Sequence, residues 1–500
     1  MCRGTTQVLL RVLTVALFFL TQSFPVCAED VSSKPPSTNL AQTIGLPDPF
    51  SFDGQVRSRY EFVNWFNSGA AGVNNNYSFP TVKSQFGVGY KQESFKLYAQ
   101  GEFDKAMGLP DDANAGTGFN YRSNNQQELN PGQVYVRQAY AQLPNIEKSG
   151  FSLLAGRFLY SSGAEVKSTN KTLDWVKTKR VADRLIGPFD FTFGRSFDGG
   201  RVDYTNSEYG TLSTQISHPT QGGFETNGML TITDISLITT ALTHGYHLGE
   251  SGQGEMQFFY YLYDDSRQAV KPDNRALSVR EADTDSIIIN NYGGHIMHTA
   301  KVGSGTWDAL TWGVVQEGQW GEDHHFAGAL VAETGYRFDE IYGEPWLRCG
   351  LNWGSGDTDE TDGSHGTFFQ MLPTVRSYAM TPFYNMMNTQ DLFIQGIWKP
   401  VNKVTFRTDL HFLNLTESSD LLYSGGGANS RNGSFGYSGA ASNGQSDVGI
   451  LLDANLWFDL TDKVGLYFYY GHLFAGDLPE STFPAHKDID YGLVELTLKL

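Results

Sequence analysis

Cysteine is nearly absent from the 500-residue chain, which contains only Cys2, Cys27 and Cys349. The first two lie in the N-terminal stretch MCRGTTQVLLRVLTVALFFLTQSFPVCA, which has a basic start, an apolar centre and small or apolar residues near Ala28. This pattern predicts a secretory signal peptide that is cleaved after Ala28. The exported chain would then keep one cysteine, so an internal disulfide is excluded and the fold must be stabilised in another way.

Charged residues are also scarce, at 18% of the chain, whereas aromatic residues make up 14%. This balance is the opposite of that found in disordered proteins. The net charge is −18, and loss of the two signal-peptide arginines would change it to −20, which argues against a nucleic-acid partner. After the signal peptide there is no run of 18 apolar residues, so a later membrane-spanning helix is excluded.

Signatures of catalysis are missing as well. The sequence has neither a Gly-x-Ser-x-Gly nucleophile motif nor a phosphate-binding loop. His295 and His298 are three residues apart, which on a strand places them on opposite faces, and the adjacent His324 and His325 are separated in the same way. We therefore predict that the protein is not an enzyme and has no cofactor, and we keep hydrolysis at an outer rim as the alternative.

What the sequence does contain is alternation with a period of two residues. In VGILLDANLWFDL, residues 448–460, Ile450 and Leu452 share one face while Asp453 and Asn455 share the other. Such alternation indicates a strand with one face in an apolar medium and one in water. The alternating runs are longer than the roughly 5–6 residues of a soluble sandwich strand and suit the roughly 9–11 residues of a tilted membrane strand.

About eighteen such runs occur, and their connectors alternate in length. Connectors after even-numbered runs are short and those after odd-numbered runs are mostly long, as in outer-membrane barrels with short periplasmic turns. We therefore predict an all-β fold, a transmembrane antiparallel β-barrel of about 18 strands over residues 51–500, wide enough for an aqueous lumen. It would follow a signal peptide (1–28) and a periplasmic lead-in (29–50), in the outer membrane of a Gram-negative-type cell. The runs lie near 51–64, 79–91, 94–104, 133–144, 150–158, 195–206, 209–218, 228–243, 253–264, 287–300, 306–317, 323–338, 344–354, 389–398, 402–413, 446–460, 462–473 and 488–500.

Positions that we assign to the inside of the barrel include many cations and several acids. One interpretation is that arginines pair with acids and brace the wall. The other is a cationic constriction, because guanidinium groups bind carboxylates through paired hydrogen bonds and select anions. The candidate pore residues are Arg57, Arg59, Lys96, Arg137, Arg157, Arg201, Arg348 and Arg407, with Lys83 also inward, and the inward acids are Glu61, Glu102, Asp203, Asp409, Asp453 and Glu495.

Two connectors carry concentrated charge. The loop 159–194 has a basic run that could guide an anionic chain, bind lipopolysaccharide phosphates or simply be solvated; it contains Lys167, Lys171, Lys177, Lys179, Arg180 and Arg184. The loop that begins NWGSGDTDETDGSHG at residue 352 is acidic, and Asp357, Asp359 and Asp362 are candidate Ca²⁺ ligands. Their spacing does not match the EF-hand, because the third acid comes one residue late and no glutamate closes the loop.

Several short motifs resemble the alginate-export porin family. They are GSGD (354–357), GTF (366–368) and LPT (372–374) in the acidic loop, and RSRYEF (57–62), VRQAYAQL (136–143), AGR (155–157) and FDGGRVDYT (197–205) elsewhere. The resemblance implies a monomeric eighteen-stranded outer-membrane barrel with an electropositive pore for an anionic polysaccharide. It supports a lumen position for Arg57, Arg59, Arg137, Arg157 and Arg201. It also implies that loops can enter and gate the pore, for which residues 105–132 are the candidate.

The leading functional hypothesis is therefore a channel that exports an anionic exopolysaccharide such as alginate, with a periplasmic export complex as a possible partner. The alternatives are a porin that takes up small organic anions and a surface adhesion barrel. In each case we expect contacts with outer-membrane lipid and lipopolysaccharide. The acidic loop would face the outside and pack over the barrel mouth.

Overall fold

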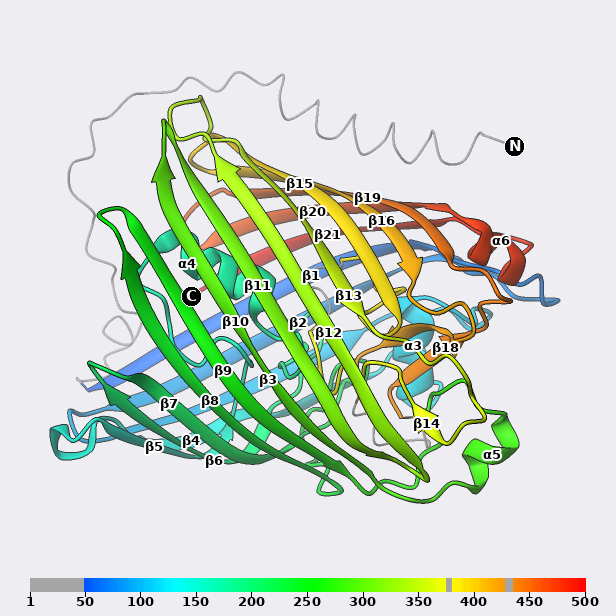
Figure 1. The fold of residues 1–500 in the computed structure, drawn as a ribbon, viewed down its shortest axis with the longest axis horizontal. Helices are drawn as coiled ribbons and strands as arrows, with labels where there is room; N and C mark the ends of the chain where they lie inside the picture. The colour runs from blue at the N-terminus through cyan, green and yellow to red at the C-terminus, as the bar shows by residue number, and fades with distance from the viewer. Residues whose placement is uncertain (1–48, 375–379, 428–434) are drawn as a thin grey trace.

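The computed structural model describes residues 49–374, 380–427 and 435–500. They form a closed antiparallel β-barrel of eighteen strands, in which β1 pairs with β21 to complete the ring (Figure 1). The wall strands are β1 (Phe50–Asn64), β2 (Asn76–Lys91), β3 (Lys96–Ala106), β4 (Gly132–Leu143), β5 (Phe151–Phe158), β6 (Phe197–Asn206), β7 (Gly210–Pro219), β8 (Ile235–Leu248), β9 (Gly252–Asp265), β10 (Ile287–Val302), β11 (Gly305–Trp320), β12 (Asp323–Arg337), β13 (Trp346–Gly354), β15 (Thr389–Val401), β16 (Val404–Leu415), β19 (Asp447–Asp459), β20 (Val464–Ala475) and β21 (Ile489–Lys499).

The connectors contain a few short elements. None of the described helices is long and apolar enough to cross a membrane. The two-residue strand β14 (Ser364–His365) pairs with β12, and β17 (Leu422–Gly425) forms a separate hairpin with β18 (Tyr437–Ala440). The helical segments are α3 (Thr117–Asn124), η1 (Ile146–Lys148), α4 (Lys171–Val176), η2 (Lys177–Val181), α5 (Leu277–Ala282) and α6 (Asp477–Thr482).

The predicted alternation is confirmed along the wall. On β19, Ile450 and Leu452 are 39% and 40% exposed on the outer face, whereas Asp453 and Asn455 are each 1% exposed on the inner face. Hydrocarbon contact requires apolar side chains outside, and a closed ring pairs every backbone amide within the sheet, so no polar edge meets the apolar medium. Each predicted run overlaps one wall strand.

The two ends of the barrel differ. One end carries short turns such as 207–209 and 402–403, and β1 begins and β21 ends there. The other end carries the long connectors, and α3, α5 and α6 lie at this end in Figure 1. The turn 321–322 between β11 and β12 is a short connector at the long-loop end. The predicted signal peptide and nearly all of the lead-in lie outside the described residues.

The eighth predicted strand was placed too early. It was expected at 228–243, but β8 runs from Ile235 to Leu248. Residues before it form a loop that folds back on itself, with a bridge between Thr220 and Thr231 and with Ile232 buried. The apolar residues of this loop imitate a strand in the sequence, but Met229 and Leu230 are exposed while Ile232 is buried, so no continuous face of the segment is buried.

An apolar core fills part of the mouth at the long-loop end. In the connector 355–388, Phe368, Phe369, Met371 and Leu372 are all fully buried. They follow the acidic stretch of this connector, so the loop packs into the mouth as expected for a folded cover. This core narrows the lumen from the outer side and holds the neighbouring loops in place.

Candidate functional site

The connector between β5 and β6, residues 159–194, folds into the barrel. Its helix α4 lies among the barrel strands in Figure 1 and contacts β10 and β11. Lys177, directly after this helix, forms an ion pair of 2.5 Å with Glu255 of β9. Near the other end of the loop, Arg59 of β1 donates a hydrogen bond of 2.8 Å to Thr192 Oγ1. We call this segment the inserted loop; it is attached to opposite parts of the wall and narrows the lumen.

Local sequence explains the shape of the inserted loop. The Asn170 side chain caps α4 by accepting hydrogen bonds from the backbone amides of Thr172 and Leu173, at 2.9 and 3.1 Å. Ile186 is fully buried and forms a parallel bridge with Leu372 of the connector 355–388. Burial of these apolar side chains favours the inward position over one in water.

Glu333 of β12 binds three arginines. Its carboxylate lies 2.8 Å from Arg180 and 3.3 Å from Arg184, both of the inserted loop, and 3.0 Å from Arg348 of β13. Arg348 also forms an ion pair with Asp308 of β11. All five side chains are buried, where an unpaired charge would be strongly unfavourable. This cluster therefore fixes the basic part of the inserted loop to the wall.

A β-bulge places Arg137 inside the barrel. Between β3 and β4, Gln138 pairs with Gln100 and Val136 pairs with Gly101, so Arg137 is the extra residue of β4. A bulge of this kind redirects a side chain and bends the strand. The Arg137 side chain is fully buried.

Arg137 belongs to a second ion-pair cluster. Glu102 of β3 lies 3.6 Å from Arg137 and 3.3 Å from Lys83 of β2. Asp190 of the inserted loop pairs with Lys83 and lies 3.8 Å from Arg137. Together with the Glu333 cluster, this arrangement attaches the middle and the C-terminal part of the inserted loop by charge.

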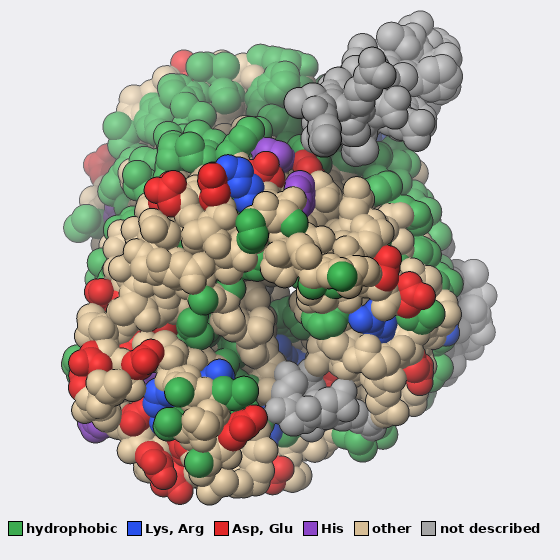
Figure 2. Space-filling view, turned by 90° about the vertical axis from the view of Figure 1, so that its right-hand side faces the viewer, with side chains coloured by type: hydrophobic (Ala, Val, Ile, Leu, Met, Phe, Trp, Pro, Cys, Tyr) green, Lys and Arg blue, Asp and Glu red, His purple; other side chains and the backbone are tan. Residues whose placement is uncertain are grey.

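Solvent reaches the side of the inserted loop that faces β16, β20, β21 and β1. Lys179 of the loop is exposed and lies close to Arg407 of β16. Tyr467 of β20 also lies near Arg407, and on β1 the side chain of Arg57 is 14% exposed. The Asp190 side chain is 38% exposed. Figure 2 shows a hollow at the long-loop end, with Lys or Arg side chains in its depth.

Lys179 differs from the other charged groups of this opening. Within the part of the chain that the structure describes, no carboxylate lies within 4.0 Å of its ammonium group. Arg407, its neighbour, forms an ion pair of 2.6 Å with Asp409. Lys179 therefore contributes a positive charge to the opening that no close carboxylate of the described residues neutralises.

The connector between β3 and β4 also reaches the interior of the barrel. Its residues, 105–132, are those predicted to enter the pore. Thr117 of its helix α3 donates a hydrogen bond of 3.0 Å to Glu61, an inward acid of β1. The Tyr121 ring lies 5.1 Å from that of Phe193 in the inserted loop. The connector thus packs in the mouth, and its role in gating stays a prediction.

Seven of the eight predicted pore residues face inward, and six of these form ion pairs. Arg59 is 2.5 Å from Glu495, Arg57 is 3.6 Å from the same carboxylate, and Arg201 is 2.8 Å from Asp203. Lys96 contacts the Tyr140 hydroxyl at 2.9 Å instead. The inward arginines are Arg57, Arg59, Arg137, Arg201, Arg348 and Arg407. These pairs agree with wall bracing, and a role in substrate passage stays a prediction.

Arg157 does not face the lumen. On β5 it shares a face with Leu153, which is 39% exposed on the outside of the barrel, and it pairs across the sheet with Ala139, which is also exposed. Its guanidinium binds Asp198 through two hydrogen bonds of 2.8 and 2.7 Å and contacts Met229. Arg157 is the second-last residue of its strand, where a polar group can face outward because the apolar belt ends.

Sequence reasoning missed three inward acids of the ion-pair clusters. Glu255, Asp308 and Glu333 all occupy inward positions of alternating strands. The alternation itself could have identified them. The contacts of Glu255 and Glu333 with the inserted loop could not be found in this way, because the partners lie far away in the sequence.

The acidic side chains of the connector 355–388 accept hydrogen bonds from nearby residues and stabilise local turns. The Asp359 carboxylate accepts hydrogen bonds from the Thr361 amide and hydroxyl at 3.0 and 2.7 Å, and these bonds lower the pKa of Asp359. Asp362 accepts a hydrogen bond of 2.8 Å from the Ser364 amide. Asp357 is buried, and with Asp359 and Asp362 it does not form a set of converging ligands among the described residues. Calcium binding here stays a prediction.

A family model described as alginate export matches residues 48–488. The chain belongs to the alginate export family. This membership and the closed barrel place the protein in the outer membrane as a channel of the porin-like type. No curated protein matches the sequence of this family member.

Solved structures share the barrel of this alginate export family member at low sequence identity. The outer membrane protein opdK of Pseudomonas aeruginosa is 11% identical over 91% of this chain and 99% of its own, with a TM-score of 0.54. OccK9 (OpdG) of the same organism is 12% identical over 91% and 99%, with a TM-score of 0.53. OccK2 (OpdF) of P. aeruginosa, in complex with glucuronate, is 10% identical over 91% and 98%, with a TM-score of 0.52. These likenesses establish the fold alone.

Proposed function

We propose that the protein is a passive channel that exports an acidic exopolysaccharide such as alginate across the outer membrane. The substrate would pass between the inserted loop and the wall strands β16, β20, β21 and β1. Membership in the alginate export family and the position of Lys179 support this proposal. A periplasmic export complex would deliver the polymer, and a single barrel would be the functional unit.

Lys179 is the observation on which the proposal rests. A lysine ammonium is a compact charge on a flexible stem, so it can follow a carboxylate as the polymer moves. Binding in a channel must be strong enough for entry and weak enough for release. The neighbouring Arg407 and Arg57 are already paired with Asp409 and Glu495, so their charges are partly neutralised and they do not form a tight anion site.

Planar-bilayer recording tests the proposal. The wild-type channel should prefer anions in a salt gradient, and acidic oligouronates should interrupt its current from the periplasmic side. Lys179→Gln should lower the ratio of anion to cation permeability several-fold and weaken the block by oligouronates. The matched control is Lys148→Gln, because Lys148 lies exposed in the turn between β4 and β5 and carries the same charge.

Two outcomes would contradict the proposal. Cation preference of the wild-type channel would exclude an electropositive constriction. If Lys179→Gln and the wild type show the same permeability ratio and the same block by oligouronates, Lys179 does not line the substrate path.

Uptake of small organic acids is a second candidate function. Its support is the glucuronate complex of OccK2, a barrel of the same fold, because glucuronate is a single uronate unit. A monomeric uronate would then permeate and shift the reversal potential, whereas oligouronates would have no access to the opening. Block by oligouronates together with exclusion of the monomer from transport would favour export.

A further inference from the structure

Three side chains that can bind metals converge on the inner face of the wall. Asp409 and His411 lie two residues apart on β16, and Asp453 of β19 pairs directly opposite Asp409. Side chains two residues apart on a strand share a face, so all three project toward the same space. One ligand atom from each lies within 4.8 Å of the other two, and no second set of three such residues occurs in the described ranges.

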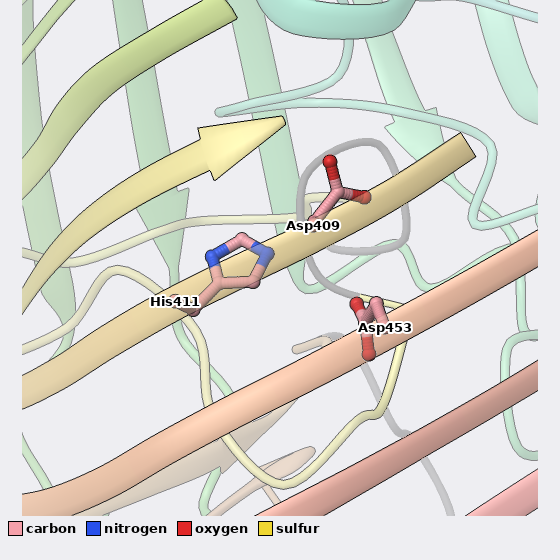
Figure 3. Close-up of side chains that lie close together, drawn as sticks. All are labelled: Asp409, His411 and Asp453. Carbon is pink, nitrogen blue, oxygen red and sulfur yellow. The ribbon is translucent and has the colours of Figure 1, made fainter. Parts of the chain in front are cut away.

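Two buried atoms at this point have no hydrogen-bond partner among the described residues: Nε2 of His411 and Oδ2 of Asp453. His411 is fully buried and Asp453 is 1% exposed. In Figure 3 one nitrogen of the His411 ring is directed between the two carboxylates. A buried polar atom that lost its water without gaining a partner is unfavourable, and a bound cation would satisfy both atoms.

The register adds an electrostatic reason for a cation. Asp409 and Asp453 are directly opposite each other, and like charges in this position destabilise a sheet. Arg407 pairs with Asp409 at 2.6 Å, but no Lys or Arg of the described residues lies within 4.0 Å of the Asp453 carboxylate. Asp453 Oδ1 accepts a hydrogen bond of 2.5 Å from the Tyr469 hydroxyl.

A fourth residue orients the imidazole. Nδ1 of His411 lies 2.8 Å from Asp391 Oδ1, and Asn352 donates a hydrogen bond of 2.9 Å to Asp391 Oδ2. A carboxylate at this distance holds the proton on Nδ1 and leaves the lone pair of Nε2 available. Metal-binding histidines commonly have a carboxylate in this position, which fixes the ring and increases its basicity.

We propose that Asp409, His411 and Asp453 bind Zn²⁺. One imidazole and two carboxylates are suitable ligands for this ion, with bonds of roughly 2.0–2.2 Å, and a fourth position is left for water. Small side-chain rotations bring three atoms that already lie within 4.8 Å to these distances. The ion connects β16 to β19 in the part of the wall next to Lys179 and Arg407. This inference does not depend on the transported substrate.

Calorimetric titration of the full-length barrel tests the site. The purified protein in detergent is treated with a chelator, dialysed and titrated with Zn²⁺ at neutral pH, and bound zinc is counted by mass spectrometry. The wild type should bind one Zn²⁺ per chain, and Co²⁺ in its place should give visible absorption bands typical of imidazole and carboxylate ligation. His411→Ala should abolish stoichiometric binding, and Asp391→Asn should weaken it by about 10–100-fold.

His472→Ala is the matched control. Nδ1 of His472 also lies 2.8 Å from a carboxylate, that of Asp490, but no further carboxylates converge on this ring among the described residues. This variant should bind Zn²⁺ like the wild type. Heat-dependent migration on gels shows whether each variant is folded, and Asp453→Asn, which preserves shape, decides the question if His411→Ala does not fold. Absence of stoichiometric binding by the wild type, or unchanged binding by a folded His411→Ala or Asp453→Asn variant, would overturn the proposal.

Discussion

Arg180 lies 2.8 Å from Glu333, although 153 residues separate them in the chain. The Arg180 guanidinium also lies over the Phe393 ring, 4.5 Å from its centroid. Both charged side chains are fully buried. The contact connects the inserted loop to β12, so a wall carboxylate helps to hold the loop inside the barrel.

Glu333→Gln should release the inserted loop. The substitution leaves Arg180, Arg184 and Arg348 facing a neutral amide, and loss of one partner from a buried charge cluster destabilises a fold by about 3–5 kcal/mol. We expect a lower denaturant midpoint and a noisier single-channel current. Glu255→Gln removes a carboxylate that Lys177 shares with His295, and it should have a smaller effect because a single basic residue of the inserted loop loses its ion pair. Equal stability of Glu333→Gln and the wild type would show that the loop is held by apolar contacts alone.

Asp190→Asn should increase the preference of the channel for anions. The Asp190 side chain is 38% exposed in the opening, and its loss leaves Lys83 and Arg137 with Glu102 as their remaining carboxylate. The local potential becomes more positive, which raises the concentration of anions. Reversal potentials in a salt gradient measure the change. Glu147→Gln, in an exposed turn, makes the same charge change and should leave the selectivity as it is.

Arg157→Gln should leave single-channel conductance and ion selectivity unchanged, because Arg157 faces the outside of the wall. Its ion pair with Asp198 is partly exposed, so stability should fall by about 1 kcal/mol or less. Paired bilayer and denaturation measurements check both statements. A clear loss of anion preference in this variant would show that Arg157 faces the lumen.

The packing of the outer loops should weaken as pH rises. Burial raises the pKa of Asp420 from 3.8 to about 6, although four hydrogen bonds, among them those from Thr367, Tyr423 and the Asp357 amide, oppose the shift. The folded state therefore binds this proton more tightly than the unfolded state. The stabilisation is complete below about pH 4 and is lost as pH rises through about 6, a change of about 3 kcal/mol.

Amide hydrogen exchange of residues 355–374, corrected for intrinsic rates, measures this loop stability. We expect stronger protection at pH 4.5 than at pH 7.5. Asp420→Asn should remove most of the dependence, because the amide does not ionise. The opposite slope in the wild type would show that hydrogen bonding to the carboxylate outweighs its burial.

The wall could be predicted from the sequence because each strand carries its own signal. Ile450 and Leu452 alternate with Asp453 and Asn455, and this local pattern follows from hydrocarbon on one face and water on the other. The same alternation gave wrong predictions for the start of the eighth strand and for the facing of Arg157. Ile232 lies between polar neighbours in a loop that precedes β8, and Arg157 lies beyond the apolar belt on the face that Leu153 shares.

The candidate site depended on information that no single segment contains. The pattern Asp409-x-His411 is visible in the sequence, but the register of β16 against β19 decides that Asp453 lies opposite. Likewise, the basic run of residues 177–184 is visible, but nothing local indicates that Arg180 forms an ion pair whereas Lys179 forms none with the described residues.

By itself, the sequence determined the barrel, its strand number and the unequal ends. Each strand must be long enough to cross the membrane and must alternate apolar and polar side chains, because one face contacts lipid and the other contacts water. Tertiary structure alone decided which charges are neutralised and which side chains converge. Coulomb attraction and metal ligation act over a few ångströms between residues that are distant in the chain, and only the closed wall and the inserted loop bring them to those distances.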